Sequence, residues 1–175
     1  MAQSTVKSGS SAGGVRAERN ESFVGRDGKR RGFLQDAKQA AESMQIEQEP
    51  YTRRVMDAFV STVLERVEER YIQQHSGTHL VDQLKDSLRY LQTRGRKETK
   101  VRVFRPSIDE NGYELNGAVL ETLMPDQPFI YDSIRLLLRK RGIRVRNSMN
   151  IVLEIIRDDV GGIERITDGA SSDST

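Results

Sequence analysis

Apolar residues after Pro50 recur at spacings of three and four, which is the period of an amphipathic helix. The first set predicts a helix of roughly six turns and comprises Val55, Met56, Phe59, Val60, Val63, Leu64, Val67 and Tyr71. The second set predicts another helix and comprises Leu80, Val81, Leu84, Leu88 and Leu91. Because only a short loop separates them, we expect residues 47–93 to form an antiparallel helical hairpin with a shared core.

A polar linker over residues 93–100 ends the helical period, and strands are predicted beyond it. Residues 101–104 form a short apolar run that stops before Pro106. Residues 118–124 form a second apolar run. Both runs are predicted to be strands.

The segment from Phe129 to Arg141 predicts an amphipathic helix. Asp126 is expected to cap its N-terminus, and Pro128 is expected to lie in its first turn, where a missing N–H costs nothing. Gly142 is expected to take the left-handed position after its C-terminus.

Alternation of apolar and polar residues follows this helix and predicts a long strand with one buried face. The apolar members are Ile143, Val145, Met149, Ile151, Leu153 and Ile155. Residues 163–166 are expected to return as a hairpin partner, and Leu137 should face the Ile151 and Leu153 side of the long strand. The order of elements predicts an α+β fold in which one helix packs on an antiparallel sheet.

The two ends of the chain differ from the part between them. The first 32 residues hold 6 of the 14 glycines and few large apolar side chains, which cannot bury enough surface to offset chain entropy. We therefore predict a mostly disordered tail over residues 1–46, in which residues 35–46 are compatible with a short helix. Residues 168–175 are predicted to form a second tail.

Composition narrows the class of protein. The 28 basic and 26 acidic residues give a net charge of +2, and aromatic residues make up only 6%, which gives no support to a base-stacking nucleic-acid binder. The chain has no cysteine, which excludes disulfides and thiolate chemistry and fits a reducing, cytoplasmic location. No run approaches the roughly 18 apolar residues of a membrane span, so no membrane partner is predicted.

Six basic residues lie close together in the sequence: Arg135, Arg139, Lys140, Arg141, Arg144 and Arg146. We interpret them as a solvated face that complements the helix dipole. Phosphate binding is the alternative, but no RNA-binding aromatic motif accompanies these residues. No nucleic-acid partner is therefore predicted.

Groups that could carry chemistry are few. His75 and His79 have the spacing of two zinc ligands on a helix, but Gly77 lies between them and no third ligand is nearby, so no metal site is predicted. Ser133 has no base spaced to activate it, and no catalytic residue is predicted. Asp126 and Asp132 bracket the predicted helix start, where they fit a cap and an ion pair to a nearby arginine.

The stretch from Leu120 to Asp158 resembles the N-terminal ACT-like region of the large bacterial NAD-specific glutamate dehydrogenases. The hallmark of that region is D-x-P-F-hydrophobic-x-D-S, followed by an amphipathic helix, a glycine and an amphipathic strand. The residues that carry it here are Asp126, Pro128, Phe129, Ile130, Asp132, Ser133 and Gly142. The resemblance covers roughly residues 50 to 166 and includes the helical pair before the strands.

The resemblance implies an ACT-like (ferredoxin-like) α+β domain over residues 99–167. ACT domains usually run β-α-β-β-α-β, whereas this chain supplies β-α-β-β, so the antiparallel sheet is expected to be incomplete and to carry one helix. The motif residues expected to be structural are Pro128, Phe129, Ser133 and Gly142. Asp126, Gln127 and Asp132 would contribute to an amino-acid effector site, which is the functional alternative to the cap and the ion pair.

The resemblance also implies the N-terminal, non-catalytic regulatory and assembly region of a NAD-dependent glutamate dehydrogenase. The full enzyme would convert glutamate to 2-oxoglutarate. Its NAD-binding site and its catalytic residues would lie in domains downstream of this chain. The expected partners are the rest of the dehydrogenase chain, further copies of it and an amino-acid effector. The alternative hypotheses are a stand-alone ACT-like interaction or amino-acid-sensing module and, least favoured, a nucleic-acid-binding protein.

Overall fold

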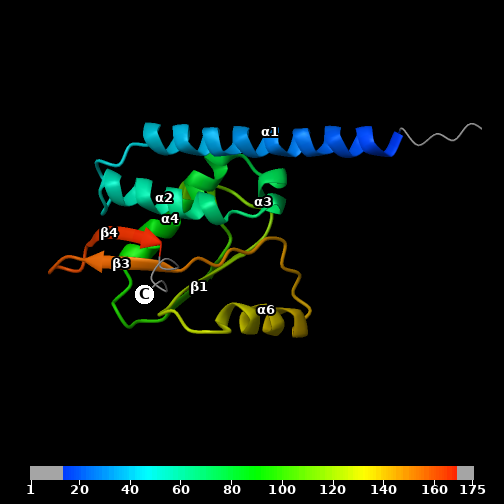
Figure 1. Cartoon of the computed structure of the whole chain (residues 1–175). Coiled ribbons are helices and arrows are strands. Elements are labelled where there is room, and N and C mark those ends of the chain that lie inside the picture. The colour runs from blue at the N-terminus through cyan, green and yellow to red at the C-terminus, as the bar shows by residue number, and fades with distance from the viewer. Residues whose placement is uncertain (1–13, 169–175) are drawn as a thin grey trace, which may run out of the picture.

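The structure is a computed structural model that describes the backbone of residues 14–168 and the side chains of residues 27–167 (Figure 1). The helices, in chain order, are α1 (Gly14–Ser43), α2 (Arg53–Arg66), α3 (Glu69–Gln74), α4 (Gly77–Gln92), α5 (Ile108–Asn111) and α6 (Ile130–Lys140). The strands are β1 (Lys100–Phe104), β2 (Val119–Leu123), β3 (Leu153–Arg157) and β4 (Ile163–Asp168). This mixture of helices and antiparallel ladders confirms the predicted α+β class.

The core lies between α2 and α4, the two helices that the apolar spacing predicted. Met56 of α2 and Leu80 and Leu88 of α4 are fully buried. Each helix begins at a hydroxyl cap, since Thr52 accepts a hydrogen bond from the N–H of Val55 and Ser76 accepts one from the N–H of His79. The strand β4 also packs against α2.

The first predicted helix, of roughly six turns, is divided in the structure, so that prediction is corrected. Val67 and Glu68 are extended, with ψ of 127° and 146°, and they separate α2 from α3. The division turns Tyr71 and Ile72 into the core, where both are buried. No glycine or proline marks this point, and the apolar spacing continues across it, so nothing in the pattern indicates the break.

The predicted tail over residues 1–46 contains α1 over residues 14–43, so disorder is corrected over residues 14–34, and residues 35–43 agree with the short helix that was allowed there. Residues 1–13 lie outside the described residues. Figure 1 shows α1 lying across the other helices, and α4 packs mainly against it. Phe33, Ala37 and Ala41 of α1 are buried in the core. The amino-acid composition did not predict this helix, because two of the three residues that it buries among the described side chains are alanines, which have small side chains. Within the described residues, no helix combines the length and apolar character needed to cross a membrane.

The strands form two separate antiparallel ladders, β1–β2 and β3–β4, and no third strand joins them within the described part of the chain. Ile155 lies opposite Ile166 in the second ladder, and Ile163 and Ile166 are buried in the helical core. The predicted long strand over residues 143–155 is shorter than expected, because only residues from Leu153 onward find a strand to pair with. Residues 143–152 have the alternating apolar and polar residues of a strand, but they do not belong to either β-ladder.

The start and the packing of α6 differ from the prediction. The helix begins after Phe129, which takes the cap position without a side-chain hydrogen bond, so neither the Asp126 cap nor the place of Pro128 in the first turn is correct. Leu137 is 53% exposed, which corrects its predicted burial against the long strand. Gly142 has φ of 70°, and its predicted left-handed conformation is confirmed.

Candidate functional site

The loop between β2 and α6 holds two of the three residues predicted to bind an effector. Asp126 and Gln127 are exposed in this loop, and Asp132 is exposed in the first turn of α6. None of the three has a hydrogen bond or ion pair with another described residue, so the structure does not bring them together around a ligand-sized enclosure. Among the described residues, Asp132 forms no ion pair with Arg135 or Arg139, the two arginines it was expected to bind. Arg135 lies over the Tyr131 ring instead, 5.4 Å from its centroid.

Phe129 joins this loop to α6 in an unusual conformation. Its φ of 66° makes it the one non-glycine residue with positive φ among the described residues, and its side chain is 79% exposed. A left-handed conformation costs a residue with a Cβ atom roughly 1–2 kcal/mol. Its carbonyl oxygen accepts a hydrogen bond from the N–H of Ser133, 2.9 Å away, which closes the first helical turn. Ser133 therefore contributes its backbone to the motif, while its side chain is exposed.

The apolar side of α6 has no extensive contact with another described helix or strand. Its members share helical spacing and none is buried: Ile130, Ile134, Leu137 and Leu138. Within the described part of the chain, one side-chain hydrogen bond joins α6 to another segment, at 2.7 Å between the hydroxyls of Tyr131 and Ser148. Figure 1 shows α6 apart from the helical core, on the side opposite α1. Ile130, Ile134 and Leu138 are half-buried, whereas Leu137 is 53% exposed, so this side of α6 is only partly covered. A helix with a well-formed apolar side that is incompletely covered has the character of a docking element.

A second exposed apolar surface lies on the β1–β2 ladder. Three exposed apolar residues lie on one face of this ladder, and we call them the outer ladder face: Val101 and Val103 of β1 and Leu120 of β2. Val103 pairs directly with Leu120 and is 69% exposed. Exposed apolar clusters of this kind mark interaction surfaces more often than isolated apolar residues do.

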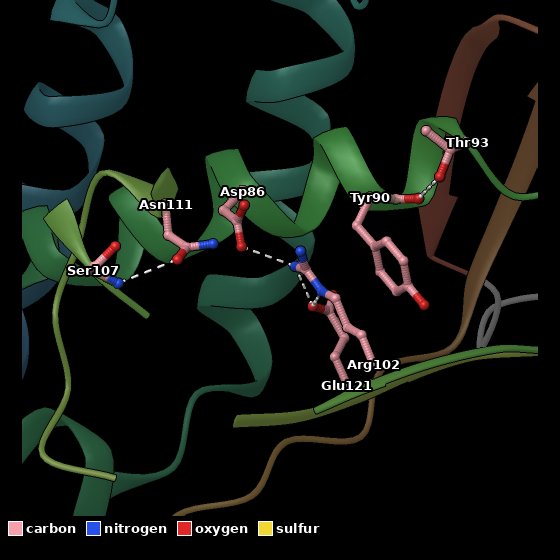
Figure 2. Close-up of polar contacts among 7 residues, drawn as sticks. All are labelled: Asp86, Tyr90, Thr93, Arg102, Ser107, Asn111 and Glu121. Atoms are coloured by element: carbon pink, nitrogen blue, oxygen red, sulfur yellow. Dashed lines mark hydrogen bonds and ion pairs between the residues drawn. The ribbon is translucent and has the colours of Figure 1, made fainter. Parts of the chain in front are cut away.

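The inner side of the same ladder is tied to α4 through Arg102 (Figure 2). The Arg102 Nε lies 2.8 Å from Oε2 of Glu121, and its Nη2 lies 2.8 Å from Oδ2 of Asp86. The guanidinium also stacks between two rings, 4.2 Å from the centroid of Tyr90 and 4.4 Å from that of Phe104. These contacts join α4, β1 and β2 at one point.

Electrostatics keep this junction charged. Burial acts to lower the pKa of Arg102, but hydrogen bonds and the charges of Glu121 and Asp86 outweigh burial and raise that pKa. Asp86 is only 6% exposed, so its carboxylate depends on Arg102 for compensation. Sequence reasoning missed this junction, because it depends on the register that places Glu121 opposite Arg102.

His75 and His79 stack at the corner between α3 and α4, with ring centroids 5.0 Å apart and planes 8° apart. His75 also lies against Tyr71, and His79 meets the edge of Tyr113. Burial and the neighbouring His79 lower the pKa of His75, while burial lowers the pKa of His79 against the opposing charge of Asp82. Among the described residues, no group of three metal-binding side chains gathers here or elsewhere.

Comparisons with known proteins agree with the resemblance seen in the sequence. The family model described as "Glutamate dehydrogenase, ACT1 domain" matches residues 59–175, more than half of the chain. A NAD-specific glutamate dehydrogenase of Halomonas elongata is 35% identical over 75 residues, and one of Pseudomonas aeruginosa is 32% identical over 78 residues. These alignments cover 43% and 45% of this chain but only 5% of each relative. No solved structure matches the chain significantly.

Proposed function

The chain belongs to the glutamate dehydrogenase ACT1 domain family, and on that basis we propose that it is a non-catalytic regulatory and assembly region of a NAD-dependent glutamate dehydrogenase. In this proposal, the conversion of glutamate to 2-oxoglutarate and the binding of NAD belong to other parts of a longer chain. The 175 residues include no glycine-rich dinucleotide fingerprint after a strand, which supports that division of roles.

The observation that carries the proposal is the pair of incompletely covered apolar surfaces, the apolar side of α6 around Leu137 and the outer ladder face. We assign both to contact with the rest of the dehydrogenase chain. The aligned part makes up 5% of each curated relative, so most of the surface available to cover them in those relatives lies outside the aligned part. Burial of apolar area of this kind is the usual source of stable contact between domains.

Regulation is the second half of the proposal. The loop with Asp126 and Gln127 leads directly into α6, whose first turn holds Asp132, so an amino-acid effector bound there would act on the same helix that docks. Assembly into a cytoplasmic homo-oligomer is part of the same proposal. Its alternative is a stand-alone module that senses amino acids and associates with itself.

The test uses the dehydrogenase that carries this region, with Leu137→Asp and the control Arg139→Gln. Leu137→Asp should disrupt assembly, measured by sedimentation, and should lower glutamate-dependent NADH formation. Arg139→Gln, on the polar side of α6, should change neither. In the 175-residue chain alone Leu137→Asp should shift the melting temperature little, because Leu137 is already half exposed.

Two results would contradict the proposal. Unchanged assembly and activity in Leu137→Asp would remove α6 from the contact. NADH formation from glutamate and NAD by the purified 175-residue chain would show that it is catalytic by itself. Self-association of the isolated chain, together with amino-acid binding and no effect in the dehydrogenase, would favour the stand-alone module.

A further inference from the structure

A groove of about 540 Å³ lies between α1 and α4 and is also lined by Asn111 and Gly112 at the end of α5. Its polar lining includes Asp36 of α1, Thr78, Asp82, Lys85 and Arg89 of α4, and Asn111 of α5. The four α4 residues recur at spacings of three and four, so one side of that helix faces the groove along its length. The volume is within the range of small-molecule sites.

The acidic side of the groove has no partner. The side chains of Asp36 and Asp82 make no hydrogen bond or ion pair with any described residue, although both line the same space. Asp82 is half-buried, and burial raises the pKa of its carboxyl group, against the opposing charges of His79 and Lys85. The charges of His79 and Lys85 compensate this carboxylate only in part, and a ligand cation in hydrogen-bond contact with it would offset the remaining cost of desolvation.

The basic side is held in place but not saturated. Lys85 and Arg89 both bind Glu49, whose carboxylate lies 3.1 Å from the Lys85 Nζ and 2.6 Å from the Arg89 Nε. An ammonium has three N–H donors and a guanidinium has five, so each group retains donors after binding Glu49. Both side chains remain partly exposed. Glu49 thus fixes two cations at the wall of the groove while leaving N–H groups for a ligand.

We propose that this groove binds a small zwitterion, with its ammonium group at Asp82 and Asp36 and its carboxylate at Lys85 and Arg89. Asp82 and Lys85 are three positions apart on α4, where side chains are neighbours with Cβ atoms about 5–6 Å apart. That separation suits a molecule whose two opposite charges are one or two carbon atoms apart. A simple anion would be repelled by the two free carboxylates, and a simple cation would leave the basic donors unused.

The site lies on the helical part of the chain, away from the loop that leads into α6. Ligand binding here needs neither a dehydrogenase nor assembly, and only a regulatory effect of the ligand would rest on the proposed function. A titration of the 175-residue chain alone therefore separates failure of this site from failure of the proposed function.

The experiment is an NMR titration of the chain with glycine and with β-alanine, beside acetate and methylammonium as probes with one charge. At least one zwitterion should shift the amide signals of residues 36–44 and 78–89, with at least tenfold tighter binding than either single-charge probe. Asp82→Asn and Lys85→Gln should each weaken that binding tenfold or more. The matched control Asp57→Asn, on the exposed side of α2, should not.

Melting curves of each variant show whether it is folded, and Asp36→Asn supplies a second acidic variant at an exposed position. Equal binding of methylammonium and the zwitterions would overturn the proposal, because it would show a site for cations only. Absence of binding by both zwitterions would overturn it directly. Binding lost in Asp126→Asn but kept in Asp82→Asn would move the site to the loop before α6.

Discussion

A Cβ atom placed on Gly77 would lie 2.2 Å from the carbonyl oxygen of Phe33 and 2.4 Å from the amide nitrogen of Ala37. Both contacts are with the backbone of α1, which cannot move aside as a flexible side chain would. The first residue of α4 is therefore glycine for a steric reason, and the close approach of α1 and α4 depends on it.

Gly77→Ala is expected to destabilise the chain by about 1–3 kcal/mol, because the two helices must separate to admit one methyl group. The control is Gly32→Ala in α1, where nothing lies within 4 Å of the added atom. Helix propensity alone makes that control neutral or stabilising by up to about 1 kcal/mol. Urea denaturation measures both, and equal midpoints for the two variants would show that α1 does not pack on α4 as described.

Arg102→Lys should destabilise the chain by about 1–3 kcal/mol although it preserves the positive charge. A lysine ammonium cannot hydrogen-bond Glu121 and Asp86 as a planar fork while stacking between Tyr90 and Phe104. Arg105→Lys, at an exposed position beyond the end of β1, is the matched control and should change little. The urea midpoint is again the measurement, and a neutral Arg102→Lys would mean that charge alone holds the ladder to α4.

Ser76→Ala should cost about 1 kcal/mol, because it removes the acceptor for the N–H of His79, 3.1 Å away. Asp126→Ala should cost less than about 0.5 kcal/mol, because α6 starts four residues later, at Ile130, and Asp126 does not cap it. Thermal melting of the two variants compares them directly. A larger loss for Asp126→Ala would mean that α6 starts earlier than described.

Lowering the pH should reduce the contribution of His75 and His79 to the stability of the folded chain. Both have a lowered pKa in the folded chain, so the unfolded chain takes up protons more readily once the pH approaches its ordinary histidine pKa of about 6.5. The stability from the neutral pair is therefore fully present above that pH and is lost as the pH falls through it.

The measurement is the urea midpoint between pH 8 and about 5.5, in the native chain and in a His75→Gln, His79→Gln double variant. The range stops there because burial raises the pKa of Asp82, which acts in the opposite direction at lower pH. The urea midpoint of the native chain should fall as the pH is lowered, and the midpoint of the double variant should fall less. Parallel curves would show that the pair does not titrate with unfolding.

The sequence predicted those elements whose burial follows from their own spacing. Helices α2 and α4 and strands β1, β2 and β4 lie close to where the pattern placed them, because each has a run of apolar residues at one period. Helix α1 was not predicted in full, because its buried residues Ala37 and Ala41 have small side chains that bury little area. Their packing on α4 depends on Gly77, more than thirty residues away.

Periodicity also says which side of an element is apolar without saying what covers it. The spacing of Leu137 with its neighbours in α6 was recognised, but no described strand packs extensively against that side. The contacts of Arg102 were not foreseen for a related reason, because they require the register of β1 on β2 and the position of α4 together. The effector role of Asp126, Gln127 and Asp132 stays a prediction.

The packing of α1 bears on where this region can be divided. The family match begins at residue 59, in the middle of α2, whereas the core draws on residues as early as Phe33. A protein trimmed to the matched range would lose the alanines that lie over α4 and half of the helix that lies over β4. The range that the family model matches is therefore smaller than the range that packs around one core. Excision of this region for study in isolation should begin ahead of Phe33.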